Sequence, residues 1–288
     1  MDKKEILAFV AGEIEKCKKN PIYFLETYAK VLTEKDGPQP FVMYDFQKEK
    51  CIKPFLAKKR IVIIKGRQMG VSTIVAGYIL WNLIFKKYFK AVIISKDREA
   101  AQGVIATIQL MIDQMPTWIM PEQKEKNKQS IGFVNKSIVS AFASSTESGR
   151  SFAVKLLIFD EAAFIESADT IYRAAMPSLS KTNGQFIMLS TPAGVGGLFA
   201  QKYLAAPENG FHAEKIMWYE MPERDEAWLK DRMLEFSEKD FSQEYGCFDA
   251  SCYVTIRNSF TGFVEELTME QLYRRLQRES DLLEWDKK

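Results

Sequence analysis

Residues 61–73 read IVIIKGRQMGVST, an apolar run followed by a glycine-bounded turn and then by a helical pattern. The run Ile61–Ile64 is typical of a buried strand. In a strand-turn-helix unit of this kind, backbone N–H groups near Gly66 and Gly70 can point at phosphate oxygens, and the helix N-terminus adds a positive dipole end. The stretch therefore indicates a phosphate-binding loop, in which the hydroxyl of Ser72 or Thr73 would hold magnesium.

The loop departs from the pattern G-x-x-x-x-G-K-[ST]. Only three residues separate Gly66 from Gly70, and Val71 stands where lysine is usual. A cation is still needed to neutralise phosphate oxygens, and Arg67 is the candidate because a guanidinium can bond two oxygens at once. Lys65 is the alternative. By itself, the loop fits equally well a strand-to-helix turn that needs glycines for steric reasons.

Short apolar runs alternate with helical patterns on the C-terminal side of this loop. Helices are expected from about residue 72 and over Asp97–Met115, and the further strands over Ala91–Ser95, Ile138–Ala143, Val154–Phe159 and Phe186–Ser190. Unbroken apolar strands are typical of parallel sheets covered on both faces. The pattern therefore predicts the α/β class, with a doubly wound, mostly parallel sheet flanked by helices.

Two adjacent carboxylates, Asp160 and Glu161, end one of these apolar strands. At the carboxyl end of a strand, the first can hold hydrated magnesium while the second reaches a water aligned on a γ-phosphate. A turn or helix start at Ala162 and Ala163 is the alternative interpretation. Together with a phosphate loop upstream, the pair favours nucleotide hydrolysis.

A third strand ends in Ser190 and Thr191, followed by Pro192. Small hydroxyls beside a phosphate site can sense whether the γ-phosphate is present. Proline and the glycines that follow are equally compatible with ordinary turn chemistry.

The remaining segments suggest four regions. Helices are expected over Lys4–Lys18, Ile22–Leu32 and Tyr44–Leu56, and again over Trp228–Phe236, Asp240–Phe248 and Thr268–Arg278, while Pro121–Gln129 is expected to be a solvated connection. We expect an N-terminal helical segment (1–40), a core (41–200), a small, mainly helical lid (201–250) and a linker (251–288).

Composition excludes several other classes of protein. The 288 residues carry a net charge of only +2, so any contact with nucleic acid must come from a local basic patch. Four scattered cysteines and the single His212 cannot form a disulfide framework or a zinc site. The longest apolar run is too short to cross a bilayer, so no membrane association is expected. Lys86–Lys90 is more typical of a helix C-terminus than of a DNA contact.

Several of these motifs together resemble the large terminase subunit of tailed bacteriophages. The resemblance lies in Arg67–Gly70 with Ser72 and Thr73, in Ser148–Ser151 ahead of Leu157–Ala162, and in Ser190–Pro192. Tyr44–Gln47 resembles the adenine-recognising glutamine motif of these motors, and Phe241–Tyr245 resembles the segment that closes their ATPase region. The similarity covers roughly Phe41–Phe248.

The resemblance implies an ASCE-type P-loop ATPase core with a lid, using ATP and Mg²⁺. It implies a motor that drives double-stranded viral DNA into a procapsid, working in the host cytoplasm and transiently at the portal. The implied partners are the viral DNA, the portal protein, the small terminase subunit and further copies of the chain in a ring, a pentamer when assembled and a monomer in isolation. Nuclease activity is not expected, because after Tyr253 only Asp281 and Asp286 remain as aspartates.

The site residues follow from the motifs and the resemblance together. Magnesium is assigned to Ser72 and Asp160, catalysis to Glu161, Arg67 and Arg150, and coupling to Ser190 and Thr191. Arg150 is expected to reach the γ-phosphate of a neighbouring subunit. Nucleotide binding is assigned to Gly66, Arg67, Gln68, Met69, Gly70, Val71, Ser72, Thr73, Tyr44 and Gln47.

Two other functions remain open at this stage. A helicase-like translocase shares the sheet and the glutamine motif, but about 90 residues after Gly197 cannot hold a second tandem ATPase domain. A nucleotide-binding scaffold with little turnover is suggested by Val71 in place of lysine.

Overall fold

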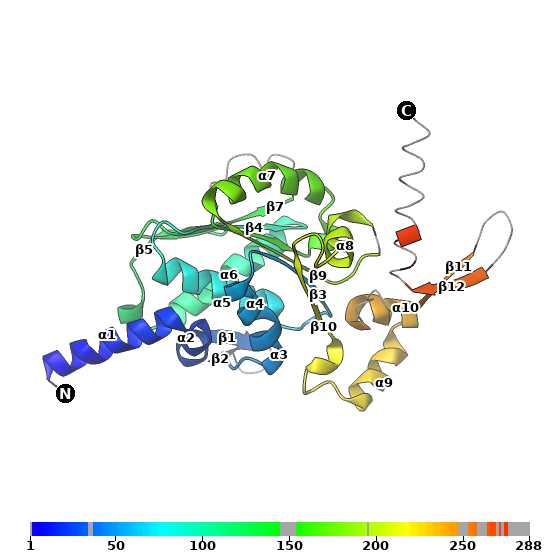
Figure 1. Ribbon diagram of the computed structural model, residues 1–288. Helices are drawn as coiled ribbons and strands as arrows, with labels where there is room; N and C mark the ends of the chain where they lie inside the picture. Colours follow the sequence, from blue (N-terminus) through cyan, green and yellow to red (C-terminus); the bar gives the residue numbers. More distant parts are fainter. Residues whose placement is uncertain are drawn as a thin grey trace.

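An eight-stranded sheet forms the centre of the chain, in the order β10-β3-β9-β8-β4-β7-β6-β5 (Figure 1). The computed structural model describes residues 2–33, 37–144, 154–194, 196–246, 253–257, 264–268, 271 and 274–275. The strands of the sheet are β3 (Arg60–Lys65), β4 (Lys90–Ser95), β5 (Gln123–Lys126), β6 (Ser130–Phe133), β7 (Ile138–Ala143), β8 (Leu156–Asp160), β9 (Gln185–Ser190) and β10 (His212–Ile216). The six from β10 to β7 are parallel, whereas β6 and β5 run antiparallel to their neighbours.

Helices cover both faces of this sheet. One core contains Ile61 and Ile63 of β3 together with α5 (Val71–Phe85) and α6 (Arg98–Gln114). A second core contains Val62 and Ile64 with α7 (Ala168–Thr182) and α8 (Gly197–Leu204). Alternate residues of one strand thus enter different cores, as expected for strands buried on both sides. Figure 1 shows α7 on the face opposite α5 and α6, which confirms the predicted α/β architecture.

The N-terminal segment differs from the all-helical expectation. It contains α1 (Lys3–Lys19) and α2 (Pro21–Tyr28), but then β1 (Lys30–Thr33) pairs with β2 (Gly37–Pro40). The second helix ends at Tyr28, because Val31 and Thr33 favour extended backbone and Gly37 adopts a left-handed φ of 69°.

This segment packs directly against the core. The indole N–H of Trp81, in α5, donates a hydrogen bond to the Cys17 carbonyl at 2.9 Å. Both residues are buried. The helical stretch that follows, predicted over 44–56, consists of α3 (Asp45–Gln47), a π-helical turn (Lys48–Ile52) and α4 (Lys53–Ala57).

The sheet continues past residue 200, where the sequence analysis expected the lid to begin. α8 packs against the core, and β10 pairs in parallel with β3. The half-buried edge strand β10 contains histidine, glutamate and lysine, so it lacks the apolar run that identified the central strands. The same reason applies to β5, a polar edge strand within the expected solvated connection.

A small, mainly helical segment follows β10; it contains the expected lid and is called the lid below. It contains a 3₁₀ turn (Trp218–Glu220), α9 (Glu226–Glu235), α10 (Glu238–Phe241) and a π-helical turn (Ser242–Gly246). An aromatic cluster joins these pieces, with ring contacts among Trp218, Trp228, Phe241 and Tyr245. In the region expected to be a linker, β11 (Tyr253–Arg257) and β12 (Val264–Thr268) form an antiparallel hairpin. Among the described residues, no helix has the length and apolar character needed to span a bilayer.

Two helical glycines test how tightly the N-terminal segment is packed. A methyl group at Gly77 in α5 would lie 2.9 Å from Cδ2 of the buried Leu25, whereas one at Gly103 in α6 would meet nothing within 4 Å. Gly103→Ala should raise the free energy of unfolding by about 0.5–1 kcal/mol through helix propensity. Gly77→Ala should lower it, because overpacking costs about 1–3 kcal/mol. Urea unfolding measures both, and equal gains would contradict the close contact of α2 with α5.

Candidate nucleotide site

Three neighbouring strands deliver polar residues to one edge of the sheet. Lys65 ends β3, Ser190 ends β9 and Asp160 ends β8. The register pairs Ile64 with Ser190 and Leu189 with Asp160, so the three carboxyl ends are level. Ligands of open parallel sheets bind at this edge. Strand β9 therefore lies between the loop strand and the carboxylate strand.

The loop after β3 has the backbone of a tight turn into a helix. Gln68 and Gly70 adopt left-handed φ values of 56° and 68°, and Gly70 is the N-cap of α5. A side chain at Gly70 would also lie 2.6 Å from Nε2 of Gln47. Glycine is thus needed here for both backbone conformation and space. The free N–H groups at the start of α5 make this turn suitable for binding an anion.

Val71 stands at the position where phosphate-binding loops usually have a lysine, but its side chain does not face the loop. Its side chain is buried in the core beneath α5, and so is that of Met69. Gln68 is exposed, and Thr73 is half-buried. Of the two candidate hydroxyls, that of Ser72 donates a hydrogen bond to Oδ1 of Asp160 at 3.3 Å.

Asp160 and Ser72 form a small oxygen-lined site at the start of α5. Burial raises the pKa of Asp160 to about 6, opposed by the Lys65 charge and by the hydrogen bond from Ser72. The described residues contain no group of three or more His, Cys, Asp or Glu side chains able to hold a metal ion. A single carboxylate beside a hydroxyl fits Mg²⁺, which binds few protein oxygens and takes its other ligands from water and substrate phosphates.

Lys65, the alternative in the sequence analysis, lies beside the acidic pair. Its ammonium is 3.3 Å from Oε1 of Glu161, and its side chain is only 7% exposed against 25% for that glutamate. Glu161 itself has a left-handed φ of 52°, which directs the chain sharply away from the end of β8. The structure therefore places a lysine at the site without using the Val71 position.

Arg67 is directed elsewhere. Its guanidinium forms an ion pair with Glu244 in the lid, and its backbone N–H donates to the Glu244 carbonyl at 2.7 Å. The side chain is 61% exposed. The assignment of Arg67 to catalysis stays a prediction. In the structure its ion-pair partner is Glu244 of the lid.

Gln47 and Tyr44 contact the loop from the side. The Gln47 amide donates to the Met69 carbonyl at 3.0 Å and accepts from the Tyr44 N–H at 3.1 Å. The Tyr44 hydroxyl donates to Glu223 at 2.8 Å. The motif thus supports the loop backbone, and adenine recognition stays a prediction.

The end of β9 contacts the turn after the carboxylates. Ser190 is fully buried, and its hydroxyl accepts a hydrogen bond from the Ala163 N–H at 3.2 Å. Thr191 is buried beside it. Arg150, expected to act on a neighbouring subunit, lies outside the described residues.

Arg224 is a loop-supporting residue that the sequence analysis missed. Its guanidinium donates to the carbonyls of Arg67 and Gln68 at 3.1 and 3.4 Å and lies over the rings of Trp228 and Tyr245. Burial lowers its pKa. No sequence signal distinguishes it, because it sits among Glu223 and Asp225 in a polar stretch that reads as solvated.

The fold is a mostly parallel α/β sheet covered by helices on both faces, in which β9 separates the loop strand β3 from the carboxylate strand β8. No family model matches the chain. Among solved structures, the large terminase ATPase domain of Thermus phage P74-26 is 22% identical with a TM-score of 0.57, covering 66% of this chain and 88% of that one. The large terminase of bacteriophage HK97 is 16% identical with a TM-score of 0.63, covering 83% of this chain and 56% of that one.

A large terminase from a thermophilic bacteriophage, solved in complex with ADP, is 14% identical with a TM-score of 0.59. The match covers 72% of this chain and 53% of that one. The chain thus spans about half the length of these two longer terminases. Its fold is that of the ATPase domains of phage large terminases, which confirms the fold expected from the motifs.

Arg224→Lys tests whether the lid holds the loop. Lysine keeps the charge but cannot fork onto two carbonyls, so the free energy of unfolding should fall by about 1–3 kcal/mol. Hydrogen exchange at the loop amides should become faster. Arg173→Lys is the matched control, because Arg173 is 77% exposed and its ion pair is with Asp169 on its own helix. If both variants behave alike, Arg224 does not support the loop.

Proposed function

We propose that this chain is the ATP-hydrolysing motor domain of a viral large terminase, which drives double-stranded DNA into a procapsid. The observation that carries the proposal is the convergence of Lys65, Ser72, Asp160 and Glu161 behind a phosphate loop. The terminase-like fold supports it independently.

Phosphoryl transfer to water would use several groups of this site. N–H groups at the C-terminal end of the loop and in the first turn of α5 would bind the phosphate chain of ATP, because those of Gly66 and Arg67 already donate to the carbonyls of Ile216 and Glu244. Ser72 and Asp160 would hold Mg²⁺, which when bound neutralises charge on the phosphate oxygens. Since α5 follows the loop directly, the hydroxyl and the N–H groups keep a fixed relation to each other.

Glu161 is the residue best placed to accept a proton from the attacking water. Its carboxylate lies 3.3 Å from the Lys65 ammonium. A phosphate oxygen would compete for that ammonium, and its departure would leave the Glu161 carboxylate free to act as a base. Lys65 thus has two roles in the proposal, which are neutralising the phosphate and restraining the base until the substrate arrives.

Ser190 would transmit the state of the site. Its hydroxyl bonds the Ala163 N–H just after Glu161, so a shift of the glutamate turn reaches the end of β9 directly. The lid contacts the loop through Glu244 and Arg224, which gives a second route. The first route starts at Ala163, two residues after Glu161, and the second starts at Arg67, two residues after Lys65.

The wider assembly remains part of the proposal. Gln47 would recognise adenine, and Arg150 would stabilise the γ-phosphate of the next subunit in a ring, where an arginine of this kind is worth about 10³–10⁵ in rate. The partners would be DNA, the portal protein and the small terminase subunit, in the host cytoplasm.

Carboxylate variants separate a motor from a nucleotide-binding scaffold. Glu161→Gln should bind a fluorescent ATP analogue as the wild type does but lose about 10²–10⁴ of its hydrolysis rate. Asp160→Asn should weaken both, because it removes the charge opposite Mg²⁺. Wild-type turnover should need Mg²⁺ and rise with double-stranded DNA. Binding without any turnover in the assembled wild type would favour the scaffold, and stimulation by single strands alone would favour a helicase.

Alanine variants identify the cation of the loop. Lys65→Ala should weaken ATP binding and hydrolysis together, because it removes the ammonium beside Glu161. Arg67→Ala should mainly loosen the lid, since its partner is Glu244. Parallel binding and turnover assays compare the two. A larger loss of hydrolysis rate in Arg67→Ala than in Lys65→Ala would indicate that Arg67, and not Lys65, is the cation that binds the phosphate.

A further inference from the structure

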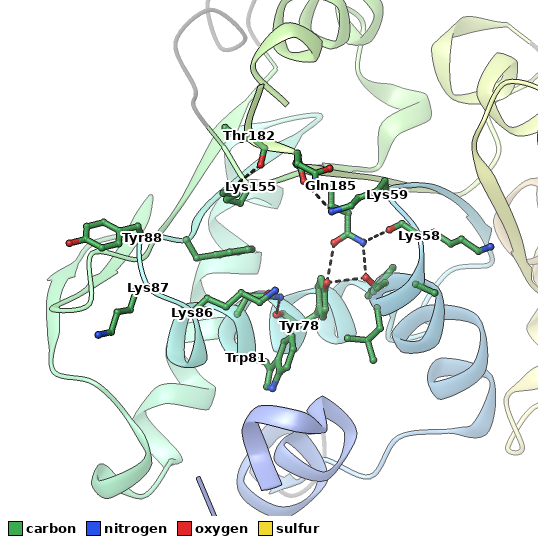
Figure 2. Close-up of a pocket in the computed structure, with 16 residues that line it drawn as sticks. Lys58, Lys59, Tyr78, Trp81, Lys86, Lys87, Tyr88, Lys155, Thr182 and Gln185 are labelled. Atoms are coloured by element: carbon green, nitrogen blue, oxygen red, sulfur yellow. Dashed lines mark hydrogen bonds between the residues drawn. The ribbon is translucent and has the colours of Figure 1, made fainter. Parts of the chain in front are cut away.

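A polar cavity lies at the opposite end of the sheet from the phosphate loop. It has a volume of about 440 Å³ and is lined at the points where strands begin, by Lys58 and Lys59 before β3, Lys86–Phe89 before β4, Lys155 before β8, and Gln185 of β9 (Figure 2). Volumes of roughly 300–1,000 Å³ are usual for small-ligand sites. Lys155 precedes β8 and Asp160 ends it, so the length of this strand separates the cavity from Asp160.

The charged side chains that line this cavity are all positive. Five lysines line it, namely Lys58, Lys59, Lys86, Lys87 and Lys155, and its lining includes no aspartate or glutamate. The whole chain has a net charge of only +2. Five lysines around one hollow therefore form a local basic patch that bulk composition could not reveal.

Two of the lysines are held in position by the end of a helix. Nζ of Lys59 donates to the Asn183 carbonyl at 3.1 Å, and Nζ of Lys155 donates to the Thr182 carbonyl at 2.7 Å. These carbonyls lie at the C-terminus of α7, where the helix dipole attracts cations. Each ammonium retains further donors for a ligand.

Lys86 is held differently, above aromatic rings. Its ammonium lies 5.3 Å from the ring centres of both Trp81 and Phe89. Desolvation and the nearby charge of Lys59 lower its pKa. A group that loses hydration and faces a like charge gains from an incoming anion.

Hydrogen bonds fix several side chains that line the floor of the cavity. The Gln185 amide donates to the carbonyls of Phe55 and Lys58 at 2.7 Å each, and the Tyr78 hydroxyl lies 3.0 Å from the Phe55 carbonyl. Oδ1 of the fully buried Asn82 has no hydrogen-bond partner among the described residues. This oxygen can accept a hydrogen bond from a hydroxyl or a protonated phosphate.

We propose that this lysine-lined cavity binds a polyanion that carries successive phosphate groups. One phosphate neutralises less than half of the five lysine charges, so two or more linked phosphates match the cavity better. The aromatic floor offers flat apolar surface beside the charges. The same chemistry is present in a nucleic-acid backbone and in a free polyphosphate. The proposal does not depend on ATP hydrolysis at the other edge.

Binding of inorganic tripolyphosphate and of a short DNA duplex tests the proposal, by calorimetry and fluorescence anisotropy at low salt. Lys58→Gln/Lys87→Gln removes two exposed charges that have no partner among the described residues, so folding should be unaffected. Lys124→Gln/Lys128→Gln is the matched control on another exposed surface. Lys65→Ala removes the contribution of the phosphate loop.

The wild type should show a binding site that survives Lys65→Ala and weakens at least about tenfold in the Lys58→Gln/Lys87→Gln variant. The salt dependence of duplex binding should fall by about two units of slope. A response to the duplex alone identifies a nucleic-acid backbone, and a response to tripolyphosphate alone identifies a free polyphosphate. Loss of all binding with Lys65→Ala, equal effects of the two lysine pairs, or equal affinity for poly-glutamate would overturn the proposal.

Discussion

The candidate site depends on the parallel register of β3, β9 and β8. Because the three strands end level, Lys65, Ser190 and Asp160 come to one edge although they lie far apart in the sequence. The hydrophobic effect fixes this register, since each strand is buried on both faces and a slip by one residue would exchange the residues of the two cores. The polar groups of the site are thus positioned by the buried apolar residues of the strands.

Contacts around the loop add a second layer of positioning. Gln47 holds the Met69 carbonyl from the N-terminal side of the core, while Arg224 holds the Arg67 and Gln68 carbonyls from the lid. The loop backbone is therefore fixed by segments before and after it in the chain. At the opposite end of the sheet the strand starts carry lysines in place of acids, so the two edges differ in charge.

Much of the fold follows from the sequence, and the exceptions have a common cause. Ile61–Ile64 and Phe186–Ser190 were predicted because strands buried on both faces must be continuously apolar. β5 and β10 were not, because edge strands are half-solvated and can be polar. The acidic pair was found from its position at a strand end. The contact of Lys65 with Glu161 could not be, since 96 positions separate the two residues and only the sheet brings them together.

A structure with Mg²⁺ and a non-hydrolysable ATP analogue tests the central claim most directly. We expect the phosphate chain to lie across residues 66–72, with the metal between Ser72 and Asp160 and the Lys65 ammonium moved from Glu161 to a phosphate oxygen. A nucleotide bound away from this edge, or a metal that contacts neither Ser72 nor Asp160, would contradict the proposed site.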